Sequence, residues 1–223
     1  MTYLDVFDTE TAGLDGGVCD IAIVRIDNDF NVVWQAESLI DPERPISPSA
    51  SGIHHITDDM VKHEPTLAEF VELNPQAFPE GGAFAGHNLA FDLRMVKAVL
   101  PQHYSKLCSL KLSRNTWVNG EVENHQLQTL RYTFGLEGGN AHRAMGDVIT
   151  CISLLKHLTK VHNTDLAGLL QLAHKPLSLD TKFPFGKHKG EKLRDLPMSY
   201  VNWALSNMTD LDPDLREALA SRK

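Results

Sequence analysis

The order of strand-like and helix-like segments constrains the fold of this 223-residue chain more than any other feature. Tyr3–Phe7 is apolar, while Cys19–Asp27 and Asn31–Ile40 are rich in β-branched and apolar residues, and each segment predicts a strand. The short connection "NDF" predicts that the second and third strands form a hairpin. A fourth predicted strand, Gly82–Gly86, precedes a helical pattern. Strands followed by strand–helix alternation predict an α/β mixed sheet with helices on its faces.

Loop and helix signals follow the third predicted strand. The segment Asp41–Gly52 is rich in Pro and Ser and predicts a loop. Thr66 is placed to cap a helix over residues 67–74. Apolar residues at helical spacing predict three further helices, over residues 89–100, 125–136 and 141–160.

Two carboxylates, Asp8 and Glu10, follow the first predicted strand directly. Side chains two residues apart on a strand point to the same face of the sheet. Two anions held this close repel each other unless a cation lies between them. A metal site is therefore one interpretation. A surface turn is the other, because the pattern Asp-x-Glu occurs by chance in many proteins.

Three further residues extend this pattern. Asp92 lies just inside the helix that follows the fourth strand, and Asp147 lies near the start of the helix over residues 141–160. An Asp beside an apolar helix face is costly unless it is paired or coordinated. Simpler interpretations exist for single residues. The helix dipole favours an acid at Asp92, and His142, one of 11 histidines, has the position of an ordinary capping or surface residue.

Together, four carboxylates and one histidine favour a metal-dependent hydrolase that cleaves phosphodiesters. Carboxylate oxygens are ligands of hard divalent cations such as Mg²⁺. Two such ions about 4 Å apart stabilise both the attacking and the leaving oxygen of a phosphodiester. His142 is then placed to be the general base that takes a proton from the attacking water.

Three short segments resemble a known family. In order and setting, "FDTETAGL", "HNLAFD" and "HRAMGD" are similar to the three motifs of the DEDDh (DnaQ-like) 3′–5′ exonuclease superfamily. The third motif reads H-x-A-x-x-D, which resembles the histidine branch of that family and not the tyrosine branch. The resemblance covers residues 1 to about 160. It implies a ribonuclease H-like fold, with a mixed five-stranded sheet flanked by helices, and a requirement for two divalent cations, Mg²⁺ or Mn²⁺.

The resemblance also implies the roles of the metal and catalytic residues. It assigns metal binding to the four acids and the general base to His142; the acids are Asp8, Glu10, Asp92 and Asp147. The chain departs from the family at one position. The second strand of the family usually carries a glutamate before its Ile, and here Asp20, with a shorter reach, stands in that place after Cys19.

Substrate contacts are implied in the same way. The backbone and the apolar side chain of the first motif are implied to hold the 3′-terminal nucleotide, through Thr11, Gly13 and Leu14. Three other residues are implied to lie near the substrate, namely His54, Asn88 and Phe91. The ring of Phe91 is suited to stack on a base.

The end of the chain differs in composition from the rest. Residues 1–174 carry 12 Lys and Arg against 22 Asp and Glu, whereas residues 175–223 carry 9 against 7. We therefore expect an exonuclease domain over residues 1–170 and a small basic C-terminal domain over residues 175–223. The latter has an apolar set of its own, which consists of Phe183, Phe185, Leu193, Leu196, Tyr200, Trp203, Leu205 and Leu215. It also resembles the C-terminal part of a bacterial member of the superfamily.

Basic residues cluster between Lys182 and Arg194, where five of them stand against one acid. One interpretation is a phosphate-contacting patch that includes Lys187 and Lys189. The alternative is a small folded lid whose lysines are solvated.

The remaining features limit the class of protein. No run of 18 apolar residues predicts a membrane span, and the first residues do not have the pattern of a signal peptide. Three widely spaced cysteines indicate a reducing compartment, so we expect a cytoplasmic protein.

We expect a metal-dependent 3′–5′ exodeoxyribonuclease that releases 5′-mononucleotides and serves DNA repair. Its expected partner is DNA, as single-stranded 3′ ends, with duplex ends left open. An RNA-directed member of the superfamily is the first alternative. A non-catalytic nucleic-acid-binding accessory protein is the second, and the complete set of five site residues disfavours it.

Overall fold

The computed structural model describes residues 3–14 and 16–222. Its centre is a five-stranded sheet with the order β3-β2-β1-β4-β5. The strands are β1 (Leu4–Thr11), β2 (Val18–Ile26), β3 (Val32–Leu39), β4 (Ala83–Gly86) and β5 (Ser105–Cys108). The first three pair antiparallel, whereas β4 is parallel to both β1 and β5. The predicted mixed five-stranded sheet is confirmed.

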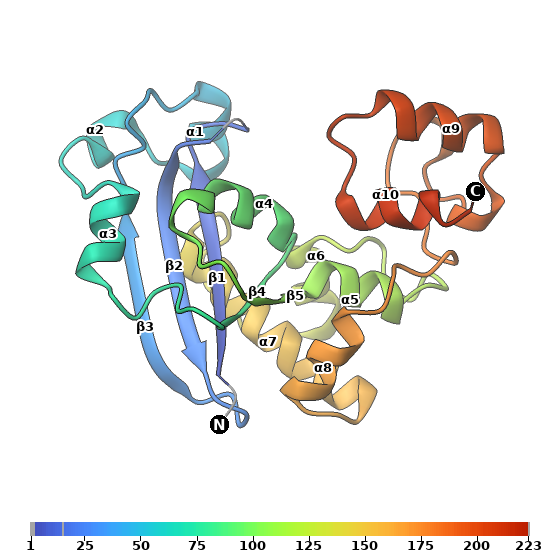
Figure 1. Cartoon of the computed structure of the whole chain (residues 1–223), viewed down its shortest axis with the longest axis horizontal. Helices are drawn as coiled ribbons and strands as arrows, with labels where there is room; N and C mark the ends of the chain where they lie inside the picture. Colours follow the sequence, from blue (N-terminus) through green and yellow to red (C-terminus); the bar gives the residue numbers. More distant parts are fainter. Residues whose placement is uncertain (1–2, 15, 223) are drawn as a thin grey trace.

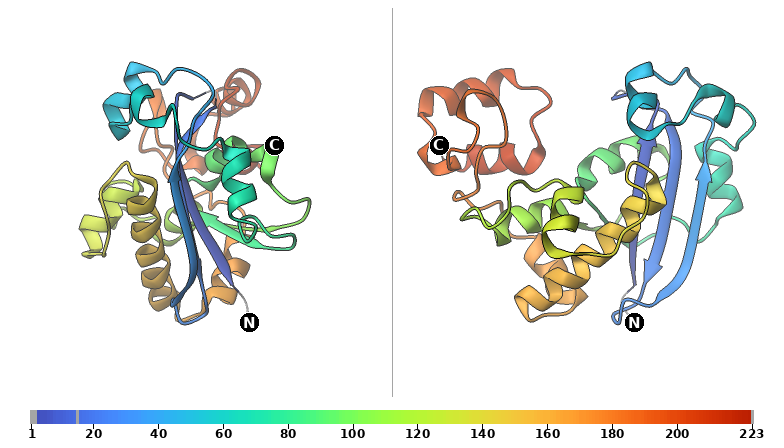
Figure 2. Two further views of the ribbon diagram at one scale, coloured as in Figure 1. Left: turned by 90° about the vertical axis from the view of Figure 1, so that its left-hand side faces the viewer. Right: turned by 180° about the vertical axis from the view of Figure 1, so that it is seen from behind.

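Helices cover both faces of the sheet (Figures 1 and 2). Those of the α/β body are α1 (Pro48–His54), α2 (Asp58–Val61), α3 (Leu67–Leu73), α4 (Leu89–Met95), α5 (Ser109–Thr116), α6 (Leu127–Phe134), α7 (Ala144–His162) and α8 (Leu166–Ala173). Alternate residues of β1 face opposite sides. Leu4 and Val6 pack in one core with α5 to α8, while Phe7 packs in the other with α3 and α4. Burial of two apolar faces fixes the sheet between two helical layers.

Local signals explain several of these boundaries. Thr66 caps α3 with a complete capping box, in which Thr66 and Glu69 satisfy each other's backbone donors. Helix α6 ends at Gly135, whose φ of 60° is left-handed and favours glycine. Helix α7 begins at Ala144, three residues later than predicted, extends to His162 and contributes apolar residues along most of its length to the core.

Some boundaries differ from the predictions. Residues 48–54 form helix α1 inside the predicted loop, because Ser47 caps it and Pro48 occupies its first position, where a missing N–H costs nothing. Strand β1 continues to Thr11, since pairing with β2 persists past the two carboxylates. Helix α4 stops at Met95 and a 3₁₀ turn follows it. The elements β5, α5 and α8 lacked a clear pattern in the sequence.

Residues 175–222, called here the C-terminal unit, contain α9 (Met198–Asn207) and α10 (Pro213–Ala220). The unit lies beside the α/β body (Figure 1) and has its own apolar cluster from Leu177 to Leu219. The expectation that its aromatic residues form this core is wrong for two of them: Phe185 is 40% exposed and Trp203 is 50% exposed. The domain limits at residues 170 and 175 stay a prediction.

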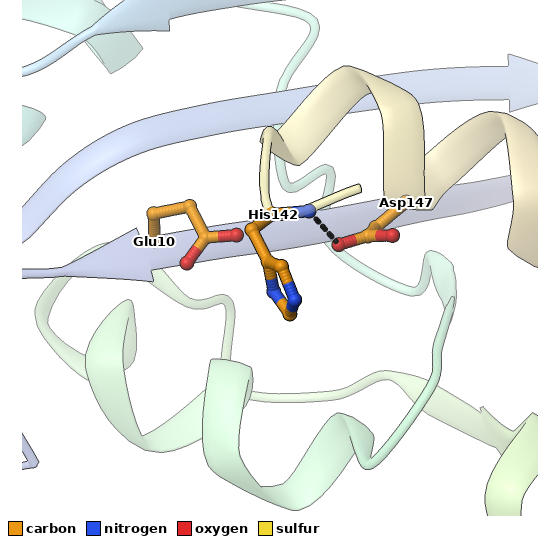
Figure 3. A group of neighbouring side chains, drawn as sticks. All are labelled: Glu10, His142 and Asp147. Atoms are coloured by element: carbon orange, nitrogen blue, oxygen red, sulfur yellow. Dashed lines mark hydrogen bonds between the residues drawn. The ribbon is translucent and has the colours of Figure 1, made fainter. Parts of the chain in front are cut away.

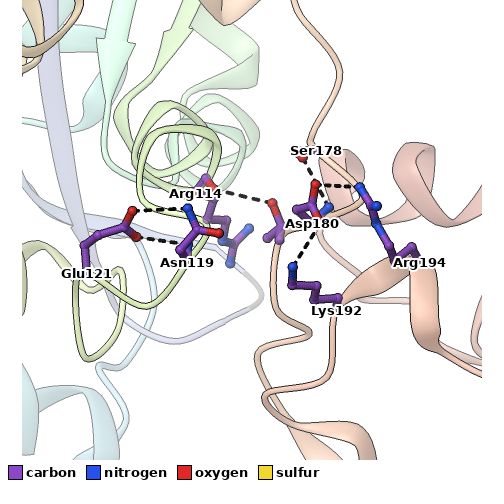
Figure 4. A network of polar contacts seen from close by, with 8 residues as sticks. Arg114, Asn119, Glu121, Ser178, Asp180, Lys192 and Arg194 are labelled. Atoms are coloured by element: carbon purple, nitrogen blue, oxygen red, sulfur yellow. Dashed lines mark hydrogen bonds and ion pairs between the residues drawn. The ribbon is translucent and has the colours of Figure 1, made fainter.

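Helix α5 holds the C-terminal unit through two ion pairs. Lys111 Nζ lies 2.9 Å from Asp214 Oδ1, and Arg114 donates to Asp212 Oδ2 at 2.9 Å. Asn115 adds two hydrogen bonds, to the carbonyl of Pro176 and from the backbone N–H of Ser178. The backbone carbonyl of Arg114 also accepts a hydrogen bond from the hydroxyl of Thr181 at 3.4 Å, and Figure 4 shows Arg114 joined to the C-terminal unit in this way. Because the four charged side chains are largely shielded from water, these pairs are screened less by salt than surface pairs are.

Within the described chain, none of the helices has the length and apolar character needed to cross a membrane.

Candidate active site

Strand β1 presents the first two acids of the site. Asp8 and Glu10 continue the every-second-residue series of Leu4 and Val6, so they point to the same sheet face, which α7 covers. Both are half-buried. A register shift between Glu10 and Thr11 ends the regular pairing with β2 at this point. The sheet therefore mounts both carboxylates on a rigid strand next to an irregular edge.

Helix α4 supplies Asp92. The residue just before this helix is Asn88, whose left-handed φ of 69° turns the chain sharply from β4 into α4. Asp92 is buried, and its Oδ1 accepts hydrogen bonds from the backbone N–H and the hydroxyl of Thr9, at 3.1 and 2.8 Å. Since Thr9 lies between the two acids of β1, these bonds fix Asp92 against the same strand.

Helix α7 supplies Asp147, and the residues before it supply His142. The His142 backbone N–H donates to Asp147 Oδ2 at 3.1 Å, and Gln128 donates to Asp147 Oδ1 at 2.7 Å. His142 has a left-handed φ of 58°. Its ring is exposed and hangs between Glu10 and Asp147 (Figure 3). One candidate ligand atom from each of these three residues lies within 4.8 Å of the others.

The four carboxylates of this site repel one another when they are ionised. Burial and then the neighbouring carboxylates Asp92 and Glu10 raise the pKa of Asp8 well above its usual range. Burial, followed by Asp147, raises the pKa of Glu10 to about 8. Burial raises the pKa of Asp92 to about 7, although the bonds from Thr9 lower it, and burial also raises the pKa of Asp147. Such crowding is costly without a cation.

The donor set fits divalent cations. Among residues 3–14 and 16–222, no Lys or Arg forms an ion pair with any of the four acids, Asp8, Glu10, Asp92 and Asp147. Carboxylate oxygens are the preferred ligands of Mg²⁺ and Mn²⁺. A group of buried and half-buried, mutually repelling carboxylates without a Lys or Arg partner has the chemistry of a metal centre.

Asp20, which the family resemblance singled out, and Arg131, which lies outside the three motifs, hold the segment that carries His142 in place. Asp20 is buried, and its Oδ2 accepts from Arg143 Nε at 2.9 Å and from the Ala144 N–H at 3.3 Å. Arg131 donates to the carbonyls of Gly138 and Gly139. Asp20 pairs with Glu10 in the β1–β2 register, which is the signal that could have placed it near the site. Gln128, Arg131 and Arg143 gave no comparable signal.

The first motif and His54 form one connected piece of structure. Leu14 is 80% exposed, whereas Thr11 is buried. The ring of His54 is only 3% exposed. Its Nδ1 accepts from the Ile56 N–H at 3.0 Å, so Nε2 carries the proton and donates to the Thr11 carbonyl at 3.2 Å. His54 therefore supports the backbone of the first motif, in which Gly13 is half-buried.

A groove of about 1320 Å³ runs from His142 and Asp147 to the C-terminal unit. At the acidic end it is lined by His142, Asp147, Leu14, Asn88 and Phe91. At the other end it is lined by Lys182, Phe183, Phe185 and Lys189. Four of the predicted substrate residues thus line one groove, namely Leu14, Asn88, Phe91 and Lys189. Lys187 does not line it and is exposed two residues before Lys189. This groove, the "site groove", has room for a polymer rather than only a small molecule.

Comparisons with known proteins support the same kind of site. The exonuclease family model RNase_T matches residues 6–155. A second model, QSregVF_b, which is described as a quorum-sensing-regulated virulence factor, matches residues 169–208. Exodeoxyribonuclease 10 of Escherichia coli strain K12 is 32% identical over 222 residues, which cover 97% of this chain and 96% of that protein. DNA polymerase III subunit epsilon of Treponema pallidum is 30% identical over 70% of this chain and 76% of that protein.

Solved structures agree with these matches. A structure of exonuclease X in complex with 5′ overhanging duplex DNA aligns with a TM-score of 0.64 and 29% identity, over 76% of this chain and 99% of that chain. This match confirms the ribonuclease H-like fold. Escherichia coli exonuclease I in complex with a dT13 oligonucleotide also aligns with a TM-score of 0.64, over 73% of this chain and 42% of that chain. Its 21% identity shows a shared fold only.

Proposed function

This chain belongs to the RNase_T exonuclease family, as its three DEDDh (DnaQ-like) motifs predicted, and from that membership we propose that it degrades DNA from the 3′ end and releases 5′-mononucleotides. The single observation that carries the proposal is the meeting of Glu10, His142 and Asp147 within 4.8 Å at one end of the site groove, next to Asp8 and Asp92. The four acids come from β1, α4 and α7, and His142 comes from the residues just before α7, so the fold itself assembles them.

The four acids are proposed to hold two divalent cations, Mg²⁺ or Mn²⁺. When bound, the ions supply positive charge that stabilises the attacking and leaving oxygens of the phosphodiester. Support comes from the carboxylates themselves, since burial and mutual repulsion raise their pKa values in the metal-free protein. The protein's part is to keep these groups together on rigid elements, with Thr9 and Gln128 orienting Asp92 and Asp147.

His142 is proposed to be the general base. Its ring is exposed in the site groove beside two acids, so water can reach it and it is placed to take a proton from an attacking water. The hydrogen bond from the His142 backbone N–H to Asp147 fixes the backbone that carries the imidazole ring. Support for the role is positional: among the five site residues it is the one that is not an acid.

The 3′-terminal nucleotide is proposed to bind between the first motif and α4. Leu14 offers an exposed apolar side chain, and Phe91 offers a ring beside Arg94. Thr11 and Gly13 present backbone next to the acids, and Asn88 lines the same groove. His54 is proposed to act on the substrate only through the Thr11 carbonyl that it supports.

DNA is the proposed substrate for two reasons. The relative exodeoxyribonuclease 10 is named for activity on DNA, and the similar structure of exonuclease X was solved with duplex DNA. Single-stranded 3′ ends are the first expected form, and the duplex in the exonuclease X structure makes duplex ends the second. We propose a cytoplasmic repair enzyme on the same basis. An RNA-directed exonuclease is the alternative, because none of the groove contacts described here distinguishes a ribose from a deoxyribose.

The test uses single-stranded DNA and RNA of one sequence, each with the protein and Mg²⁺. Controls contain EDTA or the variant Asp8→Ala. The proposal expects metal-dependent release of 5′-mononucleotides from DNA and much slower release from RNA, with neither control active. Faster digestion of RNA would assign the chain to the RNA-directed alternative. Binding of DNA without any digestion would favour the accessory protein.

A further inference from the structure

Resting on the proposed function, we propose that the C-terminal unit carries a second DNA site, at which single-stranded DNA stacks on aromatic rings several nucleotides away from the scissile end. The surface, called here the aromatic–lysine face, consists of Phe185, Tyr200, Trp203, Lys182, Lys187 and Lys189. The observation behind it is a row of aromatic rings that opens onto the far end of the site groove.

The rings form a continuous series. Phe185 lines the site groove and packs on Phe183, with ring centroids 4.6 Å apart. Phe183 meets Tyr200 at 5.7 Å, and Tyr200 stacks on Trp203 at 5.7 Å. Phe183 is fully buried and anchors the series, whereas Phe185 is 40% exposed and Trp203 is 50% exposed. Exposed apolar side chains that form one contiguous patch, unlike scattered ones, mark a binding surface.

The two ends of the aromatic series are its open parts. Gly186 has a left-handed φ of 66°, and a Cβ added there would lie 4.0 Å from the hydroxyl oxygen of Tyr200. The ring of His188 also packs on Tyr200, with ring centroids 4.3 Å apart, so Tyr200 is partly covered. A base needs flat, open ring faces, and the exposed rings of Phe185 and Trp203 supply them.

Charge selects a polyanion as the ligand. Asp180 pairs with both Lys192 and Arg194 (Figure 4), and Glu191 accepts from His188. The basic cluster is therefore partly neutralised from within. Lys182, Lys187 and Lys189 are exposed and form no ion pair among the described residues. Asp210 and Asp212 also line the groove, but Arg114 pairs with Asp212. Three unpaired lysines around exposed rings match the phosphates and bases of single-stranded DNA.

Position connects this face to the active site. Lys182 Nζ lies next to Gly120 on the opposite wall, where a Cβ at Gly120 would come within 3.0 Å of it. The ion pairs of Lys111 and Arg114 hold the unit so that Phe185 and Lys189 share one groove with His142 and Asp147. A strand that enters the acidic site at its 3′ end can follow the groove to the aromatic–lysine face. A dinucleotide is too short to occupy both.

The experiment compares kcat/KM on a dinucleotide and on a single-stranded DNA 20-mer. The variants are Phe185→Ala/Trp203→Ala and Lys187→Ala/Lys189→Ala. Controls are Leu73→Ala, an exposed apolar residue on α3, and Lys156→Ala, an exposed lysine on α7. We expect the aromatic variant to lose about five- to tenfold or more on the 20-mer, as loss of base stacking does. Its rate on the dinucleotide and its melting temperature should equal those of the wild type and both controls.

A binding measurement separates this inference from the proposed function. Fluorescence anisotropy of a labelled 20-mer in EDTA reports affinity without turnover. The lysine variant should flatten the slope of log affinity against log salt by about 1.4, since each phosphate contact on a single strand contributes about 0.7. Wild-type affinity and salt slope in both variants would overturn the inference and assign the face to a protein partner. Failure of the wild type to digest either DNA would overturn the proposed function, and the anisotropy would still decide the inference.

Discussion

At Glu10 the folded protein holds a carboxyl group with a pKa of about 8, and at Asp92 one of about 7. In an unfolded chain such groups titrate near pH 4. Between about pH 4 and pH 8 the unfolded state therefore releases protons that the metal-free folded state keeps. It follows that the free energy of unfolding of the metal-free protein falls as pH rises through this window, and that bound cations oppose the loss.

Asp8→Asn should therefore stabilise the metal-free protein. In EDTA at pH 8 we expect its melting temperature to rise by about 3 °C, since 1 kcal/mol corresponds to about 2–4 °C for a chain of this size. The gain should shrink toward pH 5, and Mg²⁺ should raise the melting temperature of the wild type more than that of the variant. Glu72→Gln, an exposed acid on α3, is the control. An equal gain from both variants would show that the site carries no special repulsion.

Asp20 and Arg143 are positioning residues in this account, because their ion pair holds the residue next to His142. Asp20→Asn should lower kcat about tenfold while KM for DNA changes little, and Arg143→Lys should keep more activity than Arg143→Ala. Asp5 on β1 and Arg25 on β2 form a largely buried ion pair away from the four acids of the site. Asp5→Asn should therefore lower the melting temperature without lowering kcat. A loss of kcat that follows the melting temperature in both variants would contradict the positioning role.

At the scale of elements, the sequence predicted those whose stability is local. The hairpin of β2 and β3 has clear alternation, Thr66 and Glu69 form a capping box, and α7 has helical periodicity over its whole length. The missed elements depend on tertiary contacts. Strand β5 has four residues, two of them exposed, and exists because β4 pairs with it. Helix α1 was hidden by Pro48, which reads as a loop residue yet begins the helix.

Helix α7 gives a prediction at this scale through Gly146. A Cβ added there would overlap the carbonyl oxygen of Asn140, in the segment that leads to His142. Gly146→Ala should therefore displace that segment, lowering both kcat and the melting temperature. Gly52→Ala in α1 is the matched control, because an added Cβ meets nothing within 4 Å there, and alanine is favoured over glycine in a helix by about 0.5–1 kcal/mol. Equal melting temperatures for the two variants would refute the close approach.

For the whole molecule, the five residues assigned to the site could be named from the sequence because each lies within a short motif of fixed spacing, and their roles stay a prediction. The shape of the site groove could not be predicted, since it depends on how the C-terminal unit docks on α5. The sequence also could not show that Phe185 and Trp203 face outward, because an amphipathic pattern in so short a segment does not say which aromatic residues are buried. Ion pairing of Lys192 and Arg194 with Asp180 was likewise hidden.

Docking of the C-terminal unit gives the prediction at this scale. Asp212→Asn/Asp214→Asn removes both partners of α5 yet keeps the cap of α10, because an Asn side chain caps as well as Asp. We expect kcat/KM on the 20-mer to fall about fivefold while the dinucleotide rate is unchanged. Asp195→Asn, an exposed acid in the same unit without an ion pair among the described residues, should change neither rate. Loss on both substrates would contradict a role limited to the distal part of the groove.

The central claim is that the protein hydrolyses DNA from its 3′ end at the site formed by the acids on β1, α4 and α7. One measurement tests this claim most directly. A 5′-labelled single-stranded 20-mer is incubated with Mg²⁺ and either the wild type or Asp147→Ala, and the products are separated by length over time. The account predicts a ladder that shortens one nucleotide at a time with the wild type and an intact strand with the variant. A ladder of equal rate with Asp147→Ala, or immediate release of the label as a mononucleotide, would contradict it.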